Sequence, residues 1–159
     1  MARKKLVYII LAGLLILVLI LVFSKGKEGG VGEYYDDICQ VKFGHPESWT
    51  KSDLVLPLPQ KPLSEATFDE PGKKSIFSYI CYDARYYSFG QFIQYSAVGS
   101  SGIEEINAEG IKWQRVGNFI YTTQNNKLII LEMFFTKYDL KPEPGYEETF
   151  LNILKTVQF

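Results

Sequence analysis

The chain has one histidine, His45, and a serine or cysteine nucleophile would need it as its base. His45 stands between a glycine and a proline, and the sequence contains no G-x-S-x-G motif. It also contains no P-loop, no G-x-G-x-x-G that opens a helix and no H-E-x-x-H. We therefore expect a non-enzymatic protein with no catalytic residues, no cofactor and a structural place for His45 in a turn.

Adjacent carboxylates are the only other groups whose spacing could do chemistry. They form four pairs: Asp36-Asp37, Asp69-Glu70, Glu104-Glu105 and Glu147-Glu148. Such pairs could share a hard cation such as calcium, but no EF-hand spacing accompanies them. The expectation is no metal site, with the pairs on the solvated surface and the last pair in the first turn of a helix, where negative charge complements the dipole.

The two cysteines, Cys39 and Cys81, are 42 residues apart and leave two interpretations open. A disulfide between them would close a loop whose constraint is worth on the order of 4 kcal/mol. Alternatively, they are buried thiols that act as small apolar side chains. With no histidine cluster beside them, they do not predict a zinc site.

Aromatic residues make up 15% of the chain, with 11 tyrosines and 11 phenylalanines. Six tyrosines cluster near the ends of predicted elements: Tyr34, Tyr35, Tyr82, Tyr86, Tyr87 and Tyr95. Tyrosines at loop tips supply amphipathic contact area for a protein, peptide or glycan partner. The alternative is that their rings line the rim of the core with the hydroxyl groups in water.

These groups must be positioned by β-strands, which the pattern of apolar residues predicts. Residues 38–43 alternate, with Cys39, Val41 and Phe43 on one face, and we expect that strand to stop at the glycine-histidine-proline turn. Trp49 follows as an apolar plug, and the proline-rich residues 53–62 predict a PPII-like or edge segment.

Residues 75–82 are apolar on both faces and predict a central strand that is covered on both sides. Further strands are predicted at residues 111–116, 119–123 and 127–135, the last two joined by an asparagine-rich turn at 124–126.

Two helices are predicted between and after these strands. Ser88 and Gln91 have capping-box spacing and introduce a helix over residues 89–98. Residues 146–157 have apolar side chains at helical spacing. Because few connections are long enough for parallel pairing, the fold class is α+β, a mainly antiparallel sheet flanked by helices.

An apolar segment at residues 6–23 has no charge and no proline over 18 residues, which as a helix spans roughly 27 Å. It predicts one transmembrane anchor. Three basic residues precede it, so we expect residues 1–5 in the cytoplasm and the C-terminal domain outside. Residues 24–34 then form a flexible tether and residues 35–159 the extracytoplasmic domain. A signal peptide cleaved after Ser24 is the alternative.

The charge distribution separates the anchor from the domain. Five of the 17 basic residues flank the apolar segment, so 12 basic residues stand against all 18 acidic ones in residues 28–159, a net charge of −6. This acidic balance argues against nucleic acid as a partner.

Three short motifs resemble those of PsbP-like domains. VKFGHPESW resembles their entry, a strand followed by Pro-x-x-Trp. TFLNILKTVQF resembles their closing F-x-x-I-L-x-T-x-x-F, and SFGQFIQ resembles the short helix after their central strand. The resemblance covers roughly residues 35–159. It implies an antiparallel sheet sandwiched by helices, as in a superfamily that includes a photosystem subunit, a nuclear Ran-binding relative and membrane-anchored proteins of unassigned role. It carries over no functional residue.

These observations predict a membrane-anchored, extracytoplasmic, non-catalytic domain that binds or scaffolds a protein, peptide or glycan partner at the cell envelope. Two alternatives are a small extracytoplasmic hydrolase with an unrecognised site and a purely structural envelope component.

Overall fold

The computed structural model describes residues 30–95, 102–133 and 145–159. Residues 31–159 form one compact unit. The predicted anchor at 6–23, its basic flank and residues 24–29 of the tether lie outside the described residues. Among the helices that are described, none is long and apolar enough to cross a bilayer.

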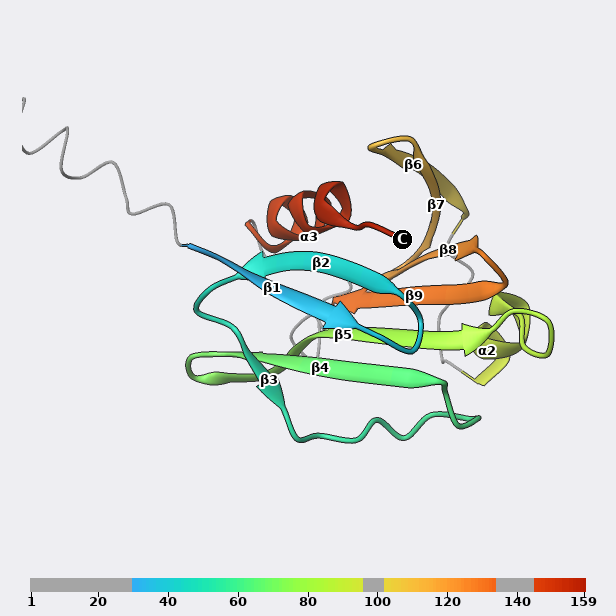
Figure 1. Ribbon diagram of the computed structural model, residues 1–159, viewed down its shortest axis with the longest axis horizontal. Coiled ribbons are helices and arrows are strands. Elements are labelled where there is room, and N and C mark those ends of the chain that lie inside the picture. Colours follow the sequence, from blue (N-terminus) through green and yellow to red (C-terminus); the bar gives the residue numbers. More distant parts are fainter. Residues whose placement is uncertain (1–29, 96–101, 134–144) are drawn as a thin grey trace, which may run out of the picture. The chain divides into compact units, whose positions relative to one another are not determined.

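A seven-stranded sheet forms the centre of the domain, with the strand order β3-β4-β5-β9-β8-β7-β6 (Figure 1). Every pair of neighbouring strands in it is antiparallel, which confirms the predicted sheet type. Its strands are β3 (Thr50–Ser52), β4 (Ser64–Glu70), β5 (Lys73–Asp83), β6 (Glu104–Ala108), β7 (Ile111–Val116), β8 (Phe119–Gln124) and β9 (Lys127–Met133).

One face of this sheet is covered by a hairpin and a helix. The hairpin consists of β1 (Val31–Asp36) and β2 (Val41–Pro46), and the helix is α3 (Tyr146–Thr156). Phe43 of β2 and Phe150 of α3 both contact Phe77 of β5, with ring centroids 5.7 and 5.9 Å apart. Trp49 is buried in the same cluster, as predicted.

The opposite face is covered by α2 (Phe89–Tyr95) and by Leu56 from the proline-rich segment. The capping box is present, because Gln91 Oε1 accepts from Ser88 N at 2.9 Å and the Ser88 hydroxyl accepts from Gln91 N at 3.3 Å. Residues 96–98 of the predicted helix lie outside the described residues. The consequence is that β5 is buried on both faces, as its sequence predicts.

The structure corrects several sequence-based boundaries. The strand predicted at 38–43 is β2 and starts at Val41, with Cys39 in the turn before it, and it continues through the glycine-histidine-proline stretch expected to end it. Strand β1 begins at Val31, so residues 31–34 belong to the domain and not to the tether. Strands β3, β4 and β6 were not predicted, because their residues are polar or lack regular alternation.

Two hairpin turns have the same geometry. Asn125 and Asn126 have φ of 49° and 60° in the predicted β8–β9 turn, and Glu109 and Gly110 have φ of 49° and 80° in the β6–β7 turn. Two successive positive φ values define a type I′ turn, in which glycine suits the second position.

We expect Asn126→Gly to raise the free energy of unfolding by about 0.5 kcal/mol, because glycine adopts positive φ without a Cβ clash. Gly110→Asn, the reverse change in the matching turn, is expected to lower it by a similar amount, since the space around Gly110 is open. Urea denaturation of both variants measures the two effects. Shifts of the same sign in the two variants would contradict the turn assignment.

Candidate functional site

A cleft opens where β7 and β8 diverge. Their ladder contains only three pairs, Gln114↔Tyr121, Arg115↔Ile120 and Val116↔Phe119, although both strands continue beyond it. Figure 1 shows the β6–β7 hairpin bending away from the rest of the sheet at this point. The end of β7 that pairs with β8 is also attached to α3, because the Arg115 guanidinium forms a bidentate ion pair with Glu147 of α3. Beyond the last pair, Gln114↔Tyr121, a gap remains between the β6–β7 hairpin and β8.

A side-chain hydrogen bond accounts for the end of the ladder. The Thr122 hydroxyl donates to the Lys112 carbonyl oxygen at 2.8 Å. That carbonyl is the acceptor that the next bonded pair of the ladder, Lys112 with Thr123, would use. The threonine hydroxyl takes the place of a backbone donor and links β8 to β7 just beyond the last backbone pair.

The backbone of Thr123 faces this gap. Gln124 and Lys127 close the two-residue turn to β9, and bonded pairs alternate along an antiparallel ladder. The N–H and C=O of Thr123 therefore point away from β9 and toward β7, with which the ladder does not pair them.

The gap contains an open cavity of about 310 Å³. Its lining combines charged, amide, hydroxyl and aromatic side chains: Glu105, Lys112, Trp113, Gln114, Tyr121, Thr122, Thr123 and Gln124. Trp113 is 0% exposed, and its indole Nε1 has no hydrogen-bond acceptor. A buried donor without an acceptor is costly to the folded protein, and this one has no exposed surface that a ligand could contact.

Tyr121 lines the cavity. Its hydroxyl donates to Gln114 Oε1, and its ring stacks on Phe89 of α2 with a centroid distance of 3.5 Å. Burial raises the pKa of the Tyr121 hydroxyl, so it remains a donor at neutral pH. This stacking fixes the Tyr121 ring, and amide and hydroxyl groups of neighbouring residues form the rest of this part of the lining.

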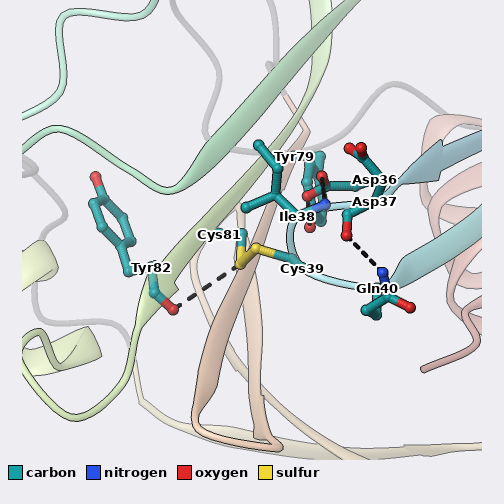
Figure 2. The surroundings of a disulfide bond; sticks show 8 residues. All are labelled: Asp36, Asp37, Ile38, Cys39, Gln40, Tyr79, Cys81 and Tyr82. Carbon is teal, nitrogen blue, oxygen red and sulfur yellow. Dashed lines mark hydrogen bonds between the residues drawn. A yellow bond between two sulfur atoms is a disulfide. The ribbon is translucent and has the colours of Figure 1, made fainter.

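The cysteines form a disulfide between the β1–β2 turn and the central strand (Figure 2). The Cα atoms of Cys39 and Cys81 lie 6.7 Å apart, and both side chains are buried. This outcome decides between the two interpretations of the sequence. The bond attaches the covering hairpin covalently to β5.

Asp36 lies beside the disulfide and is buried. Its carboxylate accepts from the Tyr79 hydroxyl at 2.7 Å and from Ile38 N at 3.0 Å, as Figure 2 shows. A carboxylate oxygen of Asp36 and the two sulfur atoms lie within 4.8 Å of one another. Because both sulfur atoms are bonded to each other in the disulfide, they offer no thiolate to a metal ion. We therefore assign the cluster a structural role.

The six tyrosines do not form one surface. Tyr34 packs against Phe43 in one core cluster, whereas Tyr82 and Tyr87 are buried in the other, on the opposite face of the sheet. Tyr35 and Tyr86 are 58% and 74% exposed. Tyr95 ends α2, and its side chain lies outside the described part of the structure. Tyr82 and Tyr87 therefore supply no contact area, and the prediction of a joint tyrosine surface is wrong for them.

His45 and the acidic pairs have structural surroundings. The His45 ring packs on Phe68 at a centroid distance of 4.9 Å, and its Nδ1 lies 2.9 Å from the Pro46 carbonyl oxygen. Asp69 is buried, contrary to the expected surface position, and accepts from Lys74 Nζ and Ser75 N, both at 2.8 Å. The hydrogen bond from Lys74, and to a smaller extent the one from Ser75 N, lower the pKa of Asp69.

A second polar cluster interrupts the apolar face under α2. Glu132 accepts from Asn118 Nδ2 at 2.9 Å and lies 3.4 Å from the Ser78 hydroxyl. Thr67, the cross-strand neighbour of Ser78, has a buried hydroxyl with no partner. Burial raises the pKa of Glu132 to about 7, against the hydrogen bonds from Asn118 and Ser78 that lower it.

Comparison with known proteins adds a similarity of fold. No family model matches the chain, and no curated protein matches it. The solution structure of cyanobacterial PsbP (CyanoP) from Synechocystis sp. PCC 6803 is 13% identical, over 85% of this chain and 96% of that one, with a TM-score of 0.49. No conclusion about the family or the function of this chain follows from a similarity of this size.

Sequence reasoning missed the cleft. The only signals are the break in alternation at the end of β7 and the four consecutive polar or amphipathic residues 121–124 in β8. Neither signal shows that the two strands part, because that depends on which hydroxyl reaches which carbonyl.

Replacing both cysteines by alanine is expected to lower the free energy of unfolding by on the order of 4 kcal/mol, because the 42-residue loop is no longer closed in the unfolded chain. Urea denaturation with and without a reductant measures it. Reductant should destabilise the native protein to the level of the double variant and leave that variant unchanged. A native protein insensitive to reductant after full thiol release would contradict this assignment.

Glu132→Gln is expected to flatten the dependence of stability on pH. The folded-state pKa of about 7 lies above the ordinary 4.5, so the folded protein binds the proton more tightly and loses stability as pH rises from about 4.5 to 7. Glutamine removes that loss and should make the protein more stable at pH 8 by roughly 3 kcal/mol. The measurement is urea denaturation from pH 4.5 to 8. Glu105→Gln, at an exposed carboxylate, is the control, and equal slopes for the native protein and Glu132→Gln would contradict the prediction.

Proposed function

We propose that the chain is a single-pass membrane protein whose extracytoplasmic domain binds a protein, peptide or glycan partner at the cell envelope without catalysing a reaction. The cleft between β7 and β8 carries the binding part of this proposal. It combines a cavity of a size at the lower end of ligand pockets with convergent polar groups.

Two observations support the extracytoplasmic placement. Disulfides persist in oxidising compartments, and the bond between Cys39 and Cys81 is buried within the domain. Residues 6–23 are apolar throughout and are preceded by three basic residues.

The hydrolase alternative has less support. The Ser78 hydroxyl lies beside Glu132, whose pKa of about 7 suits a general base, but Ser78 is 0% exposed and a substrate cannot reach it. His45 has a phenylalanine ring and a backbone carbonyl as its neighbours. Among the described residues, the cleft is the better candidate for contact with another molecule.

A topology and crosslinking experiment in intact cells tests the proposal. Protease added outside the cells should remove the C-terminal domain and leave the N-terminus protected. A photoreactive amino acid at Thr123 should give a discrete crosslinked adduct, because the partner contacts the cleft. The same group at Lys51, exposed on β3 at the other edge of the sheet, is the control and should give none. A domain protected from external protease, or identical adducts from both positions, would contradict the proposal.

A further inference from the structure

We propose that the outer edge of β6 pairs with an extended segment of another protein that carries two consecutive basic residues. The outer edge of β6 is the side of its backbone that faces away from β7, and therefore also away from β8 and the cleft. The inference thus goes beyond the function proposed for the cleft and does not depend on it. Three features carry it: the backbone groups of β6, the lack of protection at this edge and the charges beside it.

The backbone groups at the outer edge of β6 are open to a partner. β6 is the last strand in the sheet order, and Figure 1 shows the β6–β7 hairpin at the rim of the sheet. Ala108 and Ile111 close a two-residue turn, so they form a bonded pair, and bonded pairs alternate along the ladder. The N–H and C=O of Glu105 and Asn107, both exposed residues, therefore point away from β7. An extended segment adds to such an edge by main-chain hydrogen bonds.

The outer edge of β6 lacks most of the features that protect sheet edges. Such edges are commonly blunted by proline, lysine, a β-bulge or a very short strand. The opposite edge strand, β3, has three residues and is followed by the proline-rich segment. β6 has five residues without proline or lysine, and its register with β7 is continuous. Its charges are the carboxylates of Glu104 and Glu105, which protect it only against a partner that is negative at the same place.

These two carboxylates determine the chemistry of the partner. They lie on opposite faces of β6, since successive side chains of a strand alternate. Arg115 is the cross-strand neighbour of Glu104, but its guanidinium is bound to Glu147, and Glu105 has the neutral Gln114 opposite it. Basic side chains directly opposite the carboxylates on an added strand would be favourable. Because the side chains of that strand alternate as well, two consecutive basic residues meet both carboxylates.

A second copy of this chain fits the edge less well. Pairing of two β6 edges brings four carboxylates onto one short ladder, and like charges on neighbouring strands are destabilising. Residues 28–159 carry 12 basic and 18 acidic residues, so two copies also repel each other as a whole. The same net charge attracts a basic segment.

The test uses the full-length ¹⁵N-labelled protein in micelles of an uncharged detergent. Three acetylated and amidated heptapeptides are titrated: TVTKKVT, its acidic counterpart TVTEEVT, and TVTKKVT with the main-chain nitrogens of both lysines methylated. TVTKKVT should shift the amide signals of Glu105 and Asn107 and leave that of Lys51, in β3, in place. The acidic peptide should bind at least tenfold more weakly, and the methylated one at least fivefold, because it lacks a donor on each of its edges.

Variants of the protein test the same contact from the other side. Asn107→Pro removes an N–H that points away from β7, and it is expected to weaken the binding of TVTKKVT at least fivefold. Glu104→Gln combined with Glu105→Gln is expected to do the same by removing both charges. Glu47→Gln, at an exposed carboxylate between β2 and β3, is the matched control and should leave the affinity unchanged.

Equal affinities of the basic and acidic peptides, or of the native protein and the double glutamine variant, would overturn the proposal. So would undiminished binding of the methylated peptide, or no binding of TVTKKVT. Shifts of the β6 signals with protein concentration alone would make this edge a contact between copies and would also overturn it. If Asn107→Pro fails to fold, the methylated peptide decides. A crosslinked adduct at Thr123 without peptide binding at β6 leaves the function proposed for the cleft standing.

Discussion

The domain depends on one constraint: β5 is apolar on both faces, so both faces must be covered. The proline-rich segment and α2 cover one face, and the β1–β2 hairpin with α3 covers the other. A two-stranded hairpin is marginal by itself. Here the disulfide from Cys39 fixes the hairpin to β5 at Cys81, and the aromatic rings of Tyr34 and Phe43 pack onto the sheet beneath. The covalent bond and the burial act on the same element.

The other half of the sheet is held differently. Strand β7 is attached at one end by its three pairs with β8 and by the ion pair between Arg115 and Glu147, which raises the pKa of the arginine. At its other end β7 pairs only with β6, the edge strand of the sheet. The β6–β7 turn keeps that hairpin folded, and the hydrogen bond from Thr122 to Lys112 links it to β8 just beyond the last backbone pair. The cleft is thus a product of the same bonds that build the sheet.

The sequence predicts the parts of this fold that follow from apolar periodicity and turn chemistry. The central strand, the Ser88–Gln91 capping box, the asparagine turn and α3 are all confirmed. Strand β4 was missed because residues 64–70 mix polar and apolar side chains, although Thr67 and Asp69 are buried with them.

The candidate site was harder to predict for a physical reason. Tyrosine content pointed to a binding surface, but the Tyr82 ring is buried in the core and its hydroxyl donates to the Gln60 carbonyl oxygen. The cleft arises from a competition between a threonine hydroxyl and a backbone N–H for one carbonyl. Differences of that kind are small in energy and leave no periodicity in the sequence.

Amide hydrogen exchange along β8 tests most directly whether the cleft exists in solution. The account predicts rapid exchange for the N–H of Thr123, which faces the gap, and slow exchange for Thr122 and Tyr121, whose amides lie in the ladders with β9 and β7. Protection of Thr123 equal to that of its two neighbours would mean that β7 and β8 are closed along their full length, and would contradict the account.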